Sequence, residues 1–160
     1  MTFYIAAFLW YNEINKFECN PDLHPGMKVR GFKMKKVLFA ASECVPFIKT
    51  GGLADVCGAL PKQFDKEEWD VRVVIPNYSC IPEKYRNQFE YVTHFYMGTG
   101  PYVPSKYVGV LKYELDGITY YFIDNQEYFD CFLPYGDIRY DIEKFTFFDK
   151  AVLSMLPQIG

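Results

Sequence analysis

The sequence has few of the residue patterns that bind metals or form disulfide frameworks. Its five cysteines are odd in number and widely spaced, with no C-x-x-C pair. This spacing disfavours both a zinc site and a disulfide scaffold, and it favours a reducing, cytoplasmic location. The two histidines, His24 and His94, have no partner at metal or catalytic-triad spacing and are expected to be structural or superficial. The sequence therefore predicts no metal centre.

Long apolar runs and blocks of like charge are also missing. No apolar run approaches the roughly 20 residues that span a bilayer. The apolar stretch from Phe3 to Trp10 lacks a preceding basic region and a following cleavage site, so we do not expect a signal peptide. The net charge is −3 without a basic block, which gives no reason to expect nucleic acid or a membrane as a partner.

What the chain does contain is enough apolar surface for a core. Half of its 160 residues are apolar and 19% are aromatic, so disorder is not expected. Residues 1–33 mix an aromatic-rich start with the loop-like stretch "CNPDLHPG", and an orderly pattern begins only at Met34. We interpret 1–33 as an N-terminal extension from a translation start assigned too early, and 34–160 as the domain. The alternative is a helix over residues 3–17 that packs on the domain.

The orderly part begins with a strand–helix–strand pattern. Val37–Ala41 and Asp70–Pro76 are short apolar runs typical of buried parallel strands. Between them, one helical face is predicted to be apolar, with Pro61 ending its regular hydrogen bonding and Gly58 allowing close approach to the sheet. The residues of that face are Leu53, Val56, Cys57, Leu60 and Phe64. The pattern predicts a βαβ unit with parallel strands and a right-handed crossover.

The second half of the chain predicts antiparallel strands and a last helix. Tyr107–Leu115 and Ile118–Ile123 flank Asp116-Gly117, a favoured dipeptide for a type I′ hairpin turn, and Phe89–Tyr96 is a further strand. Residues 128–140 are predicted to be loop, and a helix is predicted from Asp141 onward. Its buried face is expected to contain Ile142, Phe145, Phe148, Val152, Leu156 and Ile159. The fold class is thus α/β, with a parallel sheet core that carries an antiparallel hairpin.

The stretch "KTGGLADV" (Lys49–Val56) lies between the first strand and its helix. Ligands bind open α/β sheets beyond the carboxyl ends of strands, and a helix N-terminus favours an anion. Gly51 and Gly52 would let a phosphate approach the backbone, and Lys49 would supply positive charge, while Glu43 faces the same edge. A plain turn explains the two glycines equally well, because the motif is neither a dinucleotide-binding fingerprint nor a P-loop.

A longer stretch carries a resemblance to a known family. "MKKVLFAASECVPFIKTGGLADVCGALPKQF" resembles the opening of bacterial glycogen synthases and plant starch synthases, and "DVRVVIPNY", "DGITYYFIDNQEYF" and "YGDIRYDIEKFTFFDKAVLSMLP" continue it. The likeness runs from Met34 to the end of the chain. Members of this family are retaining glycosyltransferases that transfer glucose from ADP-glucose to the non-reducing end of an α-1,4-glucan. They have two Rossmann-like domains around a cleft (GT-B type), and no metal or organic cofactor is implied.

The resemblance assigns roles to the loop residues. It implies that Lys49 contacts the phosphates of the sugar nucleotide, that the amides at Gly51 and Gly52 approach them, and that Asp55 helps to shape the site. It also implies that the main catalytic residues and the nucleotide-binding domain lie beyond Gly160. The chain is then an N-terminal, acceptor-side fragment that is inactive alone. The alternative is a non-catalytic sugar- or phosphate-binding module, or a nonfunctional truncated reading frame.

One departure from the family pattern affects a sugar-site residue. Many relatives carry two acidic or amide residues where this chain has Tyr140-Asp141. An acidic role cannot be transferred to Tyr140, and either Asp137 or Asp141 is a candidate to replace it.

Overall fold

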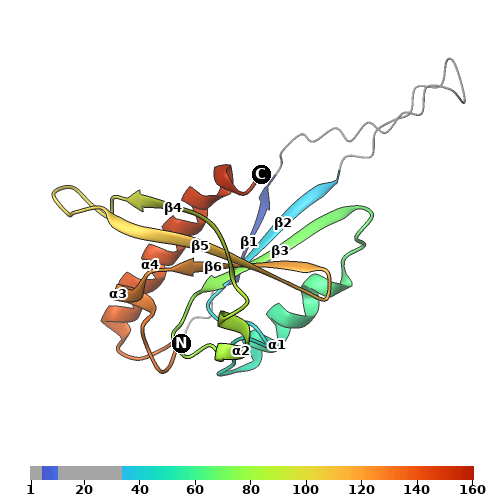
Figure 1. Cartoon of the computed structure of the whole chain (residues 1–160), viewed down its shortest axis with the longest axis horizontal. Coiled ribbons are helices and arrows are strands. Elements are labelled where there is room, and N and C mark those ends of the chain that lie inside the picture. The colour runs from blue at the N-terminus through green and yellow to red at the C-terminus, as the bar shows by residue number, and fades with distance from the viewer. Residues whose placement is uncertain (1–4, 11–33) are drawn as a thin grey trace, which may run out of the picture.

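The computed structural model describes residues 5–10 and 34–160. Within them, six strands form one mixed sheet in the order β1-β2-β3-β6-β5-β4 (Figure 1). Val73, Val74 and Ile75 are all fully buried in the central strand β3. Because neighbouring side chains of a strand point to opposite faces, both faces of the sheet centre are covered. The strands are β1 (Ile5–Trp10), β2 (Lys35–Ala41), β3 (Trp69–Pro76), β4 (Glu90–Met97), β5 (Lys106–Leu115) and β6 (Ile118–Asp124).

The centre of the sheet is parallel, as predicted. β2 pairs with β3, and β3 with β6, in parallel register. Helix α1 (Gly52–Ala59) connects β2 to β3, so the βαβ unit is confirmed. Pro61 lies in a short 3₁₀ turn, η1 (Leu60–Gln63), that directly follows α1. The expected interruption at this proline is therefore confirmed.

The buried face of α1 differs from the predicted one. Val56 and Leu60 are exposed, whereas Leu53, Ala54, Cys57 and Gly58 are buried. A Cβ atom added at Gly58 would lie 2.8 Å from the carbonyl oxygen of Val45, so the glycine admits the loop before the helix rather than the sheet. Because this two-turn helix packs against that loop, the side that it buries differs from the one predicted by the apolar periodicity.

The hairpin and its flanking strand are confirmed. β5 and β6 pair antiparallel, and β4 pairs antiparallel with β5 on the outer side. Asp116 and Gly117 have φ values of 55° and 73°. A type I′ turn requires positive φ at both central residues, which explains why this dipeptide stands between the strands.

The last long helix, α4 (Ile138–Met155), begins before the predicted start at Asp141. Asp137 caps it, since its Oδ1 accepts hydrogen bonds from the backbone N–H groups of Arg139 (2.9 Å) and Tyr140 (3.3 Å). In the view of Figure 1, α4 (orange to red) crosses β4, β5 and β6. The helices α2 (Glu83–Arg86) and α3 (Gln126–Phe129) and the 3₁₀ turn η2 (Leu156–Gln158) are short, and α3 occupies part of the segment predicted as loop.

The predicted buried face of α4 is partly wrong. Phe148 and Val152 are buried, but Ile142 is 62% exposed, while Lys144 is only 2% exposed. Phe147, Ala151 and Met155 complete the apolar contact with the core. The helix therefore buries a charged residue in the turn where the apolar pattern predicted an isoleucine.

The alternative of an N-terminal helix is contradicted where it can be examined. Residues 5–10 form a strand that pairs antiparallel with β2 along its whole length, from Ile5 opposite Ala41 to Trp10 opposite Lys36. The rest of the predicted 1–33 extension lies outside the described residues, so the extension itself stays a prediction. Within the described part of the chain, no helix has the length and apolar character needed to cross a membrane.

Candidate functional site

The candidate site lies at the carboxyl end of β2, where the chain enters the loop that leads to α1. The loop is anchored by Phe47, which is 2% exposed and packs edge-on against Tyr120 and Phe122 with ring centroids 4.9 and 5.0 Å apart. The backbone N–H of Val45 also donates to the carbonyl of Ala54 in α1 at 3.1 Å. These contacts join the loop to the sheet and to the helix.

Glu43 is buried beneath this loop and organises it. The residue has no exposed surface, and its Oε2 accepts hydrogen bonds from the backbone N–H and the hydroxyl of Thr50, at 2.5 and 2.8 Å. Its second oxygen, Oε1, is buried without a hydrogen-bond partner among the described residues. A carboxylate at this depth is costly unless it is compensated, so Glu43 shapes the loop from within.

Neither the backbone conformation nor the packing of the chain requires glycine at positions 51 and 52. Gly51 is the N-cap of α1 with extended backbone angles (φ −154°, ψ −166°), and Gly52 is not in the left-handed region. A Cβ atom at Gly52 would meet nothing within 4 Å, and one at Gly51 would make only ordinary contact with Glu43. Neither a sharp turn nor close packing inside the chain explains the pair, and the space above Gly52 is open.

The N-terminus of α1 keeps its donors available. The first N–H groups of any helix have no partner inside the helix, and a glycine N-cap has no side chain to accept from them. Lys49 lies beside this end, where its Nζ contacts both carboxylate oxygens of Asp55 at 2.7 Å. Both side chains are more than half exposed. The predicted Lys49, Gly51, Gly52 and Asp55 are thus brought together, with Glu43 under them.

The cysteines near the site have the properties of packing residues, as predicted. Cys44 and Cys57 are buried, and burial raises the pKa of the Cys44 thiol to about 12 and that of Cys57 to about 11. Thiols with such pKa values are neutral at physiological pH and are poor nucleophiles. The four cysteines in the described ranges are free, and no group of three or more possible metal ligands occurs there.

The segment before α4, which the sequence predicted to be loop, contacts the chain next to the site. The hydroxyl of Tyr135 and Oγ of Ser42 share a hydrogen bond of 2.6 Å, next to Glu43 in the chain. Burial raises the pKa of the Tyr135 hydroxyl, the bond to Ser42 opposes that shift, and the charge of Glu43 adds to it. The Tyr135 hydroxyl therefore lies within electrostatic range of the buried carboxylate.

The acidic candidates near Tyr140 are engaged within the fold. Asp137 caps α4, and the carboxylate of Asp141 contacts Lys144 through one oxygen and the backbone N–H of Gly136 through the other. The Tyr140 hydroxyl donates to the carbonyl of Glu127 at 2.8 Å. Both carboxylate oxygens of Asp141 thus have partners within the fold. The signal that could have revealed this ion pair is the i,i+3 spacing of Asp141 to Lys144, which puts the two on one helical face.

Comparison with known proteins identifies the family of this chain. Residues 36–160 match the model of a family described as the starch synthase catalytic domain. The chain is 58% identical over 127 residues to a glycogen synthase of Lachnospira eligens and 56% identical over 124 residues to one of Lachnoclostridium phytofermentans. These alignments cover 79% and 78% of this chain but only 26% of each relative. The chain therefore spans about a quarter of the length of the curated relatives it matches.

A solved structure shares the fold. The catalytic domain of starch synthase IV from Arabidopsis thaliana, bound to ADP and acarbose, matches with a TM-score of 0.59 and 24% sequence identity. The match covers 74% of this chain and 24% of that chain. An α/β arrangement with a parallel sheet centre is confirmed by this likeness.

Proposed function

Because this chain belongs to the starch synthase catalytic-domain family, we propose that its Lys49–Asp55 segment binds the diphosphate of a nucleotide sugar. The intact enzyme transfers glucose from ADP-glucose to the non-reducing end of an α-1,4-glucan, with retention of configuration. In this proposal the chain forms one wall of a cleft in a two-domain glycosyltransferase of the GT-B type. A cytoplasmic location belongs to the proposal, since the described cysteines are free thiols.

The observation that carries the proposal is the pair of glycines that the fold does not need. Open space at Gly52, a helix N-terminus without a side-chain cap and an exposed lysine together fit a diphosphate. The first-turn N–H groups would donate to phosphate oxygens, and the helix dipole would favour their negative charge. The structural neighbour with bound ADP and acarbose supports the same classes of ligand.

Lys49 would act by exchanging partners. In the structure its ammonium contacts Asp55, but an exposed ion pair contributes little stability, so separating it costs little. When charge develops on the leaving diphosphate, Lys49 would form charge-assisted hydrogen bonds with it. The role of this segment is positioning and charge stabilisation, and Asp55 holds the lysine near the site between turnovers.

The proposal is tested by Lys49→Ala in a synthase that carries this segment. We expect kcat/KM for ADP-glucose to fall by about 30- to 1000-fold, which corresponds to ~2–4 kcal/mol of lost transition-state stabilisation. Lys62→Ala is the matched control, because Lys62 also forms an exposed 2.7 Å pair, with Asp116 at the hairpin. Equal kcat/KM values for the two variants would remove Lys49 from the site.

A second test concerns the chain by itself. We expect the purified 160-residue chain to incorporate no label from radioactive ADP-glucose into glycogen, because one wall of a cleft neither aligns donor with acceptor nor excludes water. Incorporation above a blank without protein, lost in Lys49→Ala, would show that this segment is catalytic without a second domain.

A further inference from the structure

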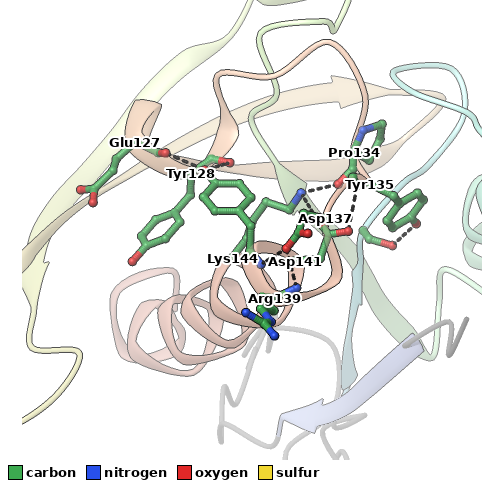
Figure 2. Close-up of polar contacts among 11 residues, drawn as sticks. Glu127, Tyr128, Pro134, Tyr135, Asp137, Arg139, Asp141 and Lys144 are labelled. Atoms are coloured by element: carbon green, nitrogen blue, oxygen red, sulfur yellow. Dashed lines mark hydrogen bonds and ion pairs between the residues drawn. The ribbon is translucent and has the colours of Figure 1, made fainter.

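A buried ion pair lies behind the segment 134–136, which contacts Ser42 next to the site. Lys144 is 2% exposed, and its Nζ contacts Asp141 Oδ1 at 2.7 Å and also donates to the backbone carbonyl of Pro134. Asp141 Oδ2 in turn accepts from the backbone N–H of Gly136 at 2.9 Å. Figure 2 shows the Lys144 side chain reaching from α4 toward Pro134, with Asp141 beside it.

Lys144 and Asp141 bond the backbone on both sides of Tyr135. Pro134 and Gly136 are the neighbours of Tyr135, so their backbone groups are held by Lys144 and Asp141 while the tyrosine side chain is left to point elsewhere. It points to the end of β2, where its hydroxyl bonds Ser42 (Figure 2). Ser42 precedes Glu43 in the chain, and the Glu43 carboxylate bonds Thr50. The contacts that fix the 134–136 segment are therefore linked through Tyr135 and Ser42 to the loop at Thr50.

We propose that Asp141 and Lys144 are positioning residues that fix Tyr135 against Ser42 and thereby hold Glu43 and the Thr50 loop in their binding geometry. The effect on the loop follows from the contacts of the ligand-free chain. Its consequence for ligand affinity rests on the proposed diphosphate site.

The geometry favours this role over mere support of the helix. An ordinary helix face would bury apolar groups here, and replacing a buried ion pair by apolar residues is often neutral or stabilising. The pair instead bonds two backbone groups of a segment that has no regular structure, and the carbonyl of the buried Pro134 would be costly to leave unpaired. What the pair specifies is therefore the path of the 134–136 segment.

The experiment uses the ¹⁵N-labelled 160-residue chain, with inorganic pyrophosphate as the probe. Three variants are compared with the parent: Lys144→Met, Lys144→Arg and Tyr135→Phe. Arg72→Met is the matched control, since Arg72 also bonds a carboxylate, Asp70 (2.7 Å), and a backbone carbonyl, that of Ile159 (2.9 Å). Its pair lies away from the Lys49–Asp55 loop, in the first half of β3.

The first measurement is made without ligand, so it does not depend on the proposed function. We expect the amide signals of Ser42 and Thr50 to shift in Lys144→Met and in Tyr135→Phe, to return toward the parent in Lys144→Arg, and to stay in place in Arg72→Met. Unmoved Thr50 signals in Tyr135→Phe, or an equal shift in Arg72→Met, would overturn the proposal. If Lys144→Met does not fold, Tyr135→Phe and Lys144→Arg decide the matter.

The second measurement is the dissociation constant of pyrophosphate, followed at the amides of Gly51 and Gly52. We expect Lys144→Met to raise it by about 2- to 30-fold, the range for side chains that affect a site without touching its ligand. Arg72→Met should leave it unchanged. If the parent chain does not bind pyrophosphate while the Thr50 signals still respond to Tyr135→Phe, the diphosphate proposal fails and the positioning role stands.

Discussion

Two lysine–aspartate pairs with the same contact distance have opposite surroundings in this domain. Lys49–Asp55 and Asp141–Lys144 both join Nζ to a carboxylate oxygen at 2.7 Å. The side chains of the first pair are 53% and 55% exposed, and those of the second 2% and 12%. The exposed pair can separate at little cost, whereas neither member of the buried pair can lose its partner without leaving a desolvated charge. Contact distance alone therefore does not distinguish an exposed lysine, proposed to bind a ligand, from a buried one.

The two regions also differ in what satisfies the backbone. In the Lys49–Asp55 region, the N-terminus of α1 has no side-chain cap, so its first N–H groups donate to no capping side chain. In the region before α4, side chains of the helix bond the carbonyl of Pro134 and the N–H of Gly136. Among the described residues, the first N–H groups of α1 thus have no capping partner, whereas the backbone groups of the second region are bonded by side chains of the same domain.

The largest effect is expected when the buried pair is broken. Lys144→Met leaves Asp141 charged and desolvated, so we expect the free energy of unfolding to fall by ~3–5 kcal/mol. Chemical denaturation measures it. Adding Asp141→Asn removes the stranded charge and should restore part of the loss. A double variant as unstable as Lys144→Met alone would mean that the stability came from packing of the lysine stem and not from charge pairing.

A smaller effect is expected at the glycines of α1. Gly58→Ala would drive a Cβ to 2.8 Å from the Val45 carbonyl, so we expect a loss of ~1–3 kcal/mol. Gly52→Ala meets open space and should change the free energy of unfolding by less than ~1 kcal/mol, yet weaken pyrophosphate binding. Thermal unfolding and titration of both variants check this. Unchanged pyrophosphate affinity in Gly52→Ala would argue that the open space is not used by phosphate.

The smallest effect on stability is expected at the exposed pair. Lys49→Ala should change the free energy of unfolding by less than ~1 kcal/mol, as should Lys62→Ala, because both lysines lie in solvent-exposed ion pairs. Denaturation curves of the two variants would then overlay. A loss at Lys49 as large as that at Lys144 would remove the contrast between the regions and make Lys49 a structural residue.

Much of the fold and the outline of the site could be predicted from local patterns. The βαβ unit, the interruption at Pro61 and the turn at Asp116-Gly117 follow from residue types within a few positions of each other. Lys49, Gly51, Gly52 and Asp55 lie close in sequence, so their meeting at one helix end is also a local matter. The predicted extension over 1–33 and the roles of the site residues stay predictions.

The wrong predictions share a physical cause. The apolar period of α4 suggested that Ile142 is buried, but the rotation of a helix is set by whatever packs against it. Here Lys144 bonds the carbonyl of the buried Pro134, and Asp141 bonds both Lys144 and the N–H of Gly136. The backbone groups of an irregular segment leave no periodic signal in the sequence. The sequence therefore does not show which helical side chains will turn inward to bond them.

The sequence by itself determined the family, the parallel centre of the sheet and the glycine-bearing loop at the start of α1, because these depend on short stretches with strong local preferences. Only the tertiary structure decided that Glu43 lies under the loop and that Lys144 is inside while Lys49 is outside. Burial of a charge depends on contacts between distant segments, such as Tyr135 with Ser42, which form only when the whole domain has folded.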